Sequence, residues 1–198
     1  MPVRLDHADL PPGTDWAWRP AILTESLPET GPATPESGSG FAAGITVWHD
    51  LPGTPITLMQ VAPDGGADGP PHALDLICTA GPGTGYCAIS LDLPEGVLAG
   101  LDTGFVLQVD IRLGADSPPD LYLRLNIEHG PNTERLLRHL DLAGGRAARV
   151  EAGFDLGFVE MNPRRLSKIW LDLIAERPGR NRIRLHDLVV SRHRRADM

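Results

Sequence analysis

The residues best placed to do chemistry lie on the outward faces of two predicted strands. In an extended strand, side chains two residues apart point to the same side, so polar residues with this spacing form a row. An aromatic ring beside amide, guanidinium and carboxylate groups suits sugars, because the ring covers the apolar sugar face and the polar groups bind hydroxyls. We therefore expect a ligand-binding set of Arg124, Asn126, Glu128, Trp170 and Asp172 on these faces, together with His129 and Asn132 from the loop that follows the first of the two strands.

A plainer interpretation of the same residues stays open. The solvent side of an antiparallel sheet is normally polar, so Arg124, Asn126 and Glu128 need no ligand to explain them. Trp170 would then be buried under the N-terminal part of the chain. The two interpretations differ in whether Trp170 is accessible beside the polar row.

The sequence contains no recognisable motif for catalysis or for a cofactor. It has no nucleophile elbow, phosphate-binding loop or dinucleotide fingerprint, and its 7 histidines form no HxH or HExxH pair. Carboxylates that could pair as in a glycosidase are numerous, as in any acidic protein, and so indicate little. We predict no catalytic residue, no cofactor and no metal, although the loop from Asp64 to Asp68 is the best local candidate for calcium.

Two cysteines, Cys78 and Cys87, allow one disulfide at most. Apolar residues alternate on both sides of the glycine-rich turn from Gly81 to Gly85, which predicts a hairpin over 74–93 with Cys78 opposite Cys87. In that register every apolar residue of the hairpin faces the core. The thiols are either reduced core residues or a bridged pair.

From residue 44 onward, short apolar runs with a period of two are separated by turn residues, which is typical of all-β proteins. One buried face per strand predicts an antiparallel two-sheet β-sandwich. The segments 95–101 and 133–140 are compatible with helices, and for the second we favour a strand. We expect strands near 44–49, 55–61, 73–80, 85–93, 104–113, 120–129, 134–142, 147–156, 167–175 and 181–191.

Residues 1–43 differ from the rest and show no helical period. We expect an extended N-terminal arm that packs on a β-sandwich domain formed by residues 44–198. Trp16 and Trp18 lie two residues apart and would point the same way, which favours their packing onto the sandwich.

Composition limits the classes of partner. The chain has 198 residues and a formal charge of −8, which disfavours nucleic acid, because that ligand requires a basic surface. The sequence has no run of 18 apolar residues, so we predict no membrane span. The first ten residues carry Asp6 and Asp9 and lack the apolar core of a secretory leader, which predicts a cytoplasmic protein.

The order of strands from residue 105 onward resembles that of carbohydrate-binding modules with the galactose-binding-like jelly roll, through the runs 105–113, 121–127, 149–154, 169–173 and 183–191. The chain as a whole also resembles an uncharacterised alphaproteobacterial family of unknown function. The segments that carry this second resemblance are Gly13–Pro20, Asn126–Thr133 and Trp170–Leu173. The first resemblance implies a jelly-roll fold and is an analogy for function, because this fold hosts many roles.

These observations together favour a non-catalytic binding module for a saccharide or glycan. The alternative is a structural or assembly subunit that contacts a protein partner, or a second copy of itself, through an exposed sheet face or the N-terminal arm. The sequence leaves the ligand, the oligomeric state and the order of the strands open.

Overall fold

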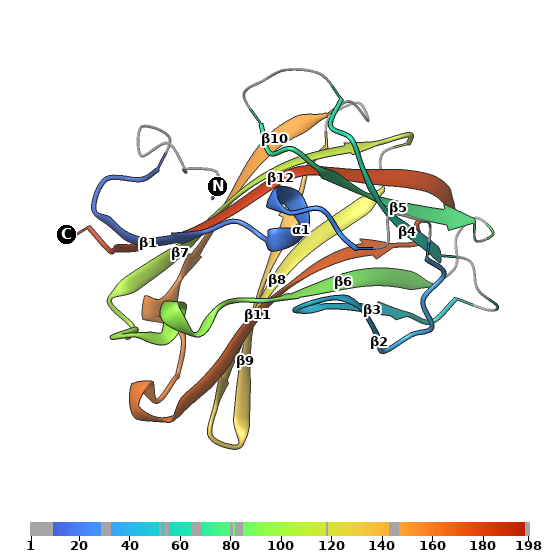
Figure 1. The fold of residues 1–198 in the computed structure, drawn as a ribbon. Helices are drawn as coiled ribbons and strands as arrows, with labels where there is room; N and C mark the ends of the chain where they lie inside the picture. Colours follow the sequence, from blue (N-terminus) through green and yellow to red (C-terminus); the bar gives the residue numbers. More distant parts are fainter. Residues whose placement is uncertain are drawn as a thin grey trace.

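Alternating apolar residues give each strand one face that must leave water, and two such sheets bury these faces against each other. The computed structural model is a sandwich of two antiparallel sheets (Figure 1). It describes residues 10–28, 33–51, 53, 56–64, 69–79, 81, 85–117, 119–142 and 147–196. The predicted two-sheet β-sandwich is therefore confirmed.

Sheet A follows the strand order β10-β7-β12-β5-β4, and β1 also pairs with β12. Its strands are β1 (Thr14–Trp18), β4 (Ile56–Val61), β5 (Ala73–Thr79), β7 (Phe105–Ala115), β10 (Ala148–Asp155) and β12 (Arg180–Arg194).

Sheet B follows the order β2-β3-β6-β11-β8-β9. Its strands are β2 (Ser39–Ala42), β3 (Ile45–His49), β6 (Tyr86–Asp92), β8 (Asp120–His129), β9 (Asn132–Leu140) and β11 (Leu166–Glu176). The described helical segments are single turns: α1 (Ala21–Thr24) and the 3₁₀ turns η2 (Glu95–Leu98), η3 (Leu156–Phe158) and η4 (Pro163–Arg165).

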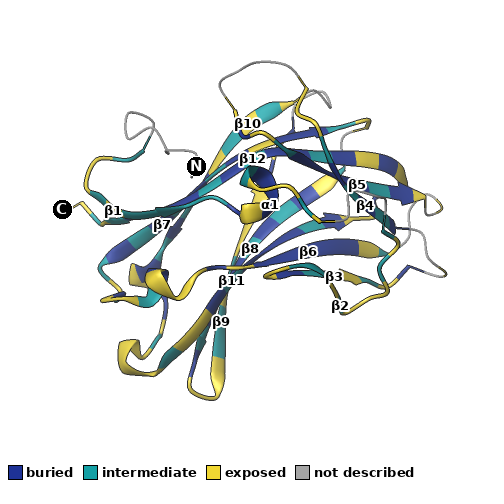
Figure 2. Ribbon diagram, in the orientation of Figure 1, coloured by how far each residue is buried: buried dark blue, intermediate teal, exposed yellow. Residues whose placement is uncertain are grey.

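The core fills the space between the sheets. Buried and more accessible residues alternate along most strands (Figure 2), as the predicted period of two requires. Phe154 of β10 and Leu107 of β7 are fully buried on the inner side of sheet A, and Leu123 and Leu125 are fully buried on that of sheet B. Among the described residues, no helix is long and apolar enough to cross a membrane.

The predicted hairpin over 74–93 is wrong. Strand β5 pairs with β4 and β12 in sheet A, whereas β6 pairs with β3 and β11 in sheet B. Alternation specifies which face of a strand is buried, and two strands that face each other across a core satisfy it as well as two hydrogen-bonded neighbours do. Cys78 and Cys87 therefore meet across the sandwich, with their Sγ atoms 3.4 Å apart, as free thiols.

The structure decides between helix and strand for the two segments that were compatible with helices. The segment 133–140 lies in strand β9, as favoured above, and 95–101 contains the 3₁₀ turn η2. Strand β9 forms a hairpin with β8, in which His129 is opposite Asn132.

The residues of the predicted N-terminal arm are built into both sheets. Strand β1 pairs with β12 and β2 pairs with β3, and the helical turn α1 lies where the sequence shows no helical period. Trp16 and Trp18 are half-buried against the core, as expected. The buried Arg192 of β12 fixes β1 in place, because its guanidinium donates to both carboxylate oxygens of Asp15 at 2.8 and 3.0 Å.

The buried cysteine pair generates a prediction about thiol reactivity. The hydrogen bond with Cys78, together with burial, raises the pKa of Cys87. Only a thiolate attacks a disulfide reagent, and Cys87 should stay protonated. The same hydrogen bond lowers the pKa of Cys78, but both thiols are fully buried and out of reach of a reagent. We therefore expect both thiols of the native protein to react slowly with an aromatic disulfide reagent and two thiols per chain to react once guanidinium unfolds it. Cys78→Ser should lower the second number to one. A fast thiol in the native protein, or fewer than two after unfolding without reductant, would contradict this arrangement.

Candidate binding cleft

The outer face of sheet B carries a cleft of about 840 Å³. It lies over strands β3, β6, β11 and β8, which are neighbours in the sheet. We call it the outer cleft and define it by its lining residues: Thr46, Trp48, Asp50, Gly85, Tyr86, Ala88, Ser90, Asp92, Arg124, Glu128, Lys168, Trp170, Asp172, Ile174, Glu176 and Arg177.

Small residues on one central strand hollow out this face. Strand β6 lies between β3 and β11, and its outward residues beside the two tryptophan-bearing strands are Ala88 and Ser90. Ala88 is opposite Trp48 of β3, so the indole stands next to a methyl group. A strand with larger outward residues at these positions would fill the space between its neighbours.

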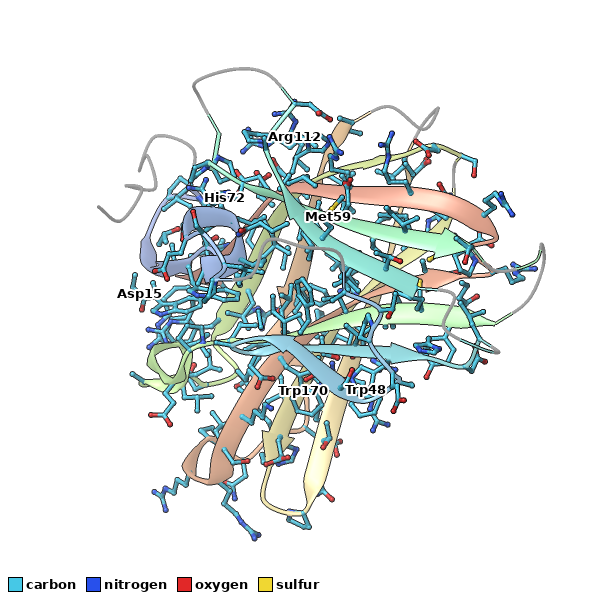
Figure 3. The ribbon with its side chains drawn as sticks, turned by 45° about the vertical axis from the view of Figure 1, so that its right-hand side comes forward. Asp15, Trp48, Met59, His72, Arg112 and Trp170 are labelled. Carbon is cyan, nitrogen blue, oxygen red and sulfur yellow. The ribbon has the colours of Figure 1, made fainter. Side chains whose placement is uncertain are left out.

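Two tryptophans stand on the same face as this hollow. Trp48 comes from β3 and is 44% exposed, and Trp170 comes from β11 and is half-buried (Figure 3). Gly38 packs under the Trp48 ring: a Cβ atom there would lie 3.3 Å from the indole, and the backbone φ of +85° also favours glycine. The position of the Trp48 ring therefore depends on Gly38.

Asp172 organises the polar floor of the cleft. The carboxylate is only 2% exposed. It accepts hydrogen bonds from the Ser90 hydroxyl, from Nε of Arg124 at 2.9 Å and from Nδ2 of Asn126 at 2.8 Å. Nη2 of Arg124 lies 2.8 Å from the same carboxylate oxygen, and the Arg124 side chain stays 40% exposed. Asp172 thus holds Arg124 in place at the floor, while part of the guanidinium faces solvent.

Charged side chains lie at both ends of the cleft, with Lys168, Asp92 and Glu128 at the end of Trp170. Nζ of Lys168 pairs with Oδ1 of Asp92 at 2.8 Å and lies 5.6 Å from the centre of the Trp170 ring. Glu128 accepts a hydrogen bond from the Ser167 hydroxyl at 2.5 Å. Asp50 accepts one from the backbone N–H of Tyr86 at 2.7 Å.

The structure brings most of the predicted set together. Arg124, Glu128, Trp170 and Asp172 line the outer cleft. Asn126 is buried in the same sheet face and donates to Asp172, which makes it a supporting residue. Strand β1 lies on sheet A, so Trp170 is not covered by it.

His129 and Asn132 lie outside the cleft. His129 belongs to strand β8 and has the same inward parity as Leu125 and Ile127. It is buried there, and its Nδ1 accepts a hydrogen bond from the backbone N–H of Asn162 at 3.3 Å. Asn132 is exposed at the first position of β9, directly after the tight turn from β8.

Several lining residues were missed by sequence reasoning. Trp48 could have been found, because Ile45 and Val47 mark the inward side of its predicted strand and place Trp48 outward. The sequence carries no signal that β3 and β11 flank the same central strand, so it could not bring Trp48 to Trp170. Asp92 and Lys168 were missed for a similar reason, because their ion pair depends on the pairing of β6 with β11, which the sequence does not indicate.

The predicted calcium candidate falls mostly outside the described residues, since the structure does not describe 65–68. The carboxylate of Asp64 pairs with Arg184, and this hydrogen bond lowers the pKa of Asp64. In the part of the chain that is described, no three His, Cys, Asp or Glu side chains are grouped to hold a metal ion.

The buried carboxylate of Asp172 generates a stability prediction. Asp172→Asn removes the charge that compensates Arg124 and replaces an acceptor by an amide donor facing Asn126. Breaking one side of a buried charged network costs about 2–4 kcal/mol, which urea unfolding can measure. The matched substitution Asp116→Asn removes the same charge from an exposed ion pair with Arg182 and should cost less than about 1 kcal/mol. Equal losses for the two variants would contradict the role given to Asp172.

Solved structures share this fold at low sequence identity. A cyclase from Fischerella sp. TAU has a TM-score of 0.59 at 12% identity, covering 91% of this chain and 100% of the cyclase. The enzymatically active domain of bacteriophage CBA120 tailspike protein 4 has a TM-score of 0.55 at 7% identity. That match covers 80% of this chain, which spans only 21% of the length of the tailspike chain. At such identities the likeness shows the fold alone.

A xylan-binding domain, CBM22-1 of Paenibacillus barcinonensis Xyn10C, is also similar, with 12% identity over 80% of this chain and 92% of that domain. Its TM-score is 0.48. No curated protein matches the sequence. A family model described as "Family of unknown function (DUF6478)" matches residues 2–198. Since this match runs over nearly the entire chain, the protein belongs to the family of unknown function DUF6478.

Proposed function

We propose that the chain is a non-catalytic binding module that holds a saccharide or glycan in the outer cleft. The observation that carries the proposal is the placement of Trp48 and Trp170 on one sheet face, with a polar floor on β6, β11 and β8 beside them. Partly exposed tryptophans are costly to leave in water, and clustered aromatic groups on a surface mark binding sites.

The chemistry of the cleft suits a molecule with apolar faces and polar edges. The indole rings can cover the C–H faces of sugar rings. The guanidinium of Arg124 donates hydrogen bonds and the carboxylate of Glu128 accepts them, so hydroxyl groups find both kinds of partner. A cleft of about 840 Å³ is within the usual size of small-molecule sites.

The absence of catalysis is part of the proposal. Asp172 is the most deeply buried carboxylate of the cleft, and its oxygens are occupied by Ser90, Arg124 and Asn126. These acceptor positions are therefore used within the protein and are not free for a substrate. Because the similar structures include a cyclase and an enzymatically active tailspike domain, the binding experiment below also includes a test for product release.

The alternative, an assembly subunit, was suggested by the two tryptophans of the N-terminal segment, and their position does not support it. Trp16 and Trp18 pack against the core of their own domain, and β1 pairs with β12 of the same chain. These aromatic residues are therefore not a free docking surface. The bacterial origin, the cytoplasmic location, the extent of the arm at 1–43 and the lack of nucleic-acid binding stay predictions.

The tryptophan pair generates the binding prediction. A glycan array probed with the purified protein should give a hit that also changes tryptophan fluorescence. Trp48→Ala and Trp170→Ala should each weaken binding of that glycan at least about tenfold, because a central aromatic contact is worth on the order of 1.4 kcal/mol or more. Incubation of the wild-type protein with the hit should release no new reducing ends.

Phe158→Ala is the matched control, since Phe158 is an aromatic residue that is 82% exposed and does not line the cleft. Its affinity should equal that of the wild type. A blank array with a folded protein would overturn the proposed function. Equal affinity of the Trp48 and Trp170 variants would place the site elsewhere, and glycan cleavage would overturn its non-catalytic part.

A further inference from the structure

A cation of the protein itself occupies the aromatic surface of the outer cleft. The ammonium of Lys168 lies 5.6 Å from the centre of the Trp170 ring and 2.8 Å from Oδ1 of Asp92. An ammonium is attracted to the negative face of an indole and, more strongly, to a carboxylate beside it. Trp170 and Asp92 are cross-strand partners, so the sheet register itself brings the two groups together.

The charges that line the outer cleft are unbalanced. The guanidinium groups of Arg124 and Arg177 are paired with Asp172 and Asp120, respectively. Three other carboxylates of the lining have no ion-pair partner among the described residues. Glu128 of β8 is opposite Lys168, at the Trp170 end of the cleft, whereas Asp50, which follows β3, and Glu176 of β11 lie at the other end, beside Tyr86. The cleft therefore combines aromatic surface with an excess of negative charge.

This combination selects for the charge of the ligand. Uncompensated carboxylates repel an anionic ligand and raise the local concentration of a cationic one. An ammonium that reaches Trp170 and Asp92 gains both contacts that Lys168 makes. We infer that the outer cleft takes a glycan with free amino groups, in which the ammonium of an amino sugar replaces Lys168 between Asp92 and Trp170. This inference rests on the proposed function and names the ligand class of the same site.

Lys168 can give way to such a ligand at small cost. Its side chain is 47% exposed and that of Asp92 is 45% exposed, and exposed ion pairs of this kind contribute little to stability. The released lysine can return to water. Replacing Lys168 by methionine should therefore strengthen binding of an amino-sugar glycan, because the internal competitor is gone and the negative excess rises.

The test compares hexasaccharides of glucosamine, N-acetylglucosamine, glucose and galacturonate by isothermal titration calorimetry. It uses low salt and about pH 6, where a sugar amine is protonated. We expect the glucosamine hexamer to bind at least about tenfold more tightly than its N-acetylated counterpart, and the galacturonate hexamer to bind most weakly. Raising the salt should reduce the difference.

Asp92→Asn and Asp116→Asn separate the site from the net charge of the protein. Both remove one negative charge, but only Asp92 lies in the cleft. The preference for the amine should fall several-fold in Asp92→Asn and persist in Asp116→Asn. Circular dichroism of each variant checks that it is folded.

Each other outcome has one meaning. Equal or tighter binding of the N-acetylated or glucose hexamer would overturn the ligand class and leave the proposed function standing. An equal loss of preference in both aspartate variants would assign it to the overall charge and overturn the role of Asp92. If no hexamer binds and the array is blank, the proposed function fails together with the inference.

Discussion

The two-residue period of the strands is the constraint on which the rest of this structure depends. Burying one face of sheet B against sheet A forces the alternate residues outward, and the outward set of β3, β6, β11 and β8 forms the cleft. The tryptophans cannot leave this face without a shift of register that would expose leucines of the core. The core thus supports the site indirectly, by fixing the side on which each polar or aromatic residue stands.

Within that frame, the depth of the site comes from contrasts between neighbouring strands. The small outward residues of β6 are opposite Trp48 on β3 and opposite Asp172 and Ile174 on β11, so a hollow remains where larger residues would fill the space. The floor is held by the buried carboxylate of Asp172, which accepts hydrogen bonds from Ser90, Arg124 and Asn126. These contacts keep the arginine in place before any ligand arrives.

Sequence reasoning was sufficient where one strand decides the outcome. Alternation alone predicted the sandwich, the outward row of Arg124 and Glu128, and the outward Trp170 and Asp172. The expected place of His129 in the polar ligand set is wrong, because His129 is the last residue of β8 and shares the inward parity of Leu125 and Ile127.

Pairing between strands was beyond the reach of the same reasoning. The expected hairpin of β5 with β6 has a consistent apolar pattern, but that pattern is also satisfied by strands facing each other across the core. The thiol contact of Cys78 with Cys87 is compatible with both arrangements. Trp48 and Trp170 are 122 residues apart in the sequence (170 − 48) and line one cleft because β6 lies between their strands. No local sequence pattern indicates this arrangement of strands.

The most direct measurement is a two-dimensional amide and indole NMR spectrum during titration with a glycan from the array. The chain has 4 tryptophans, of which Trp48 and Trp170 line the cleft and Trp16 and Trp18 pack on the core near β12. Binding in the outer cleft predicts that the indole signals of Trp48 and Trp170 move while those of Trp16 and Trp18 stay in place. Movement confined to Trp16 and Trp18, or no movement at ligand saturation, would contradict a binding site on the outer face of sheet B.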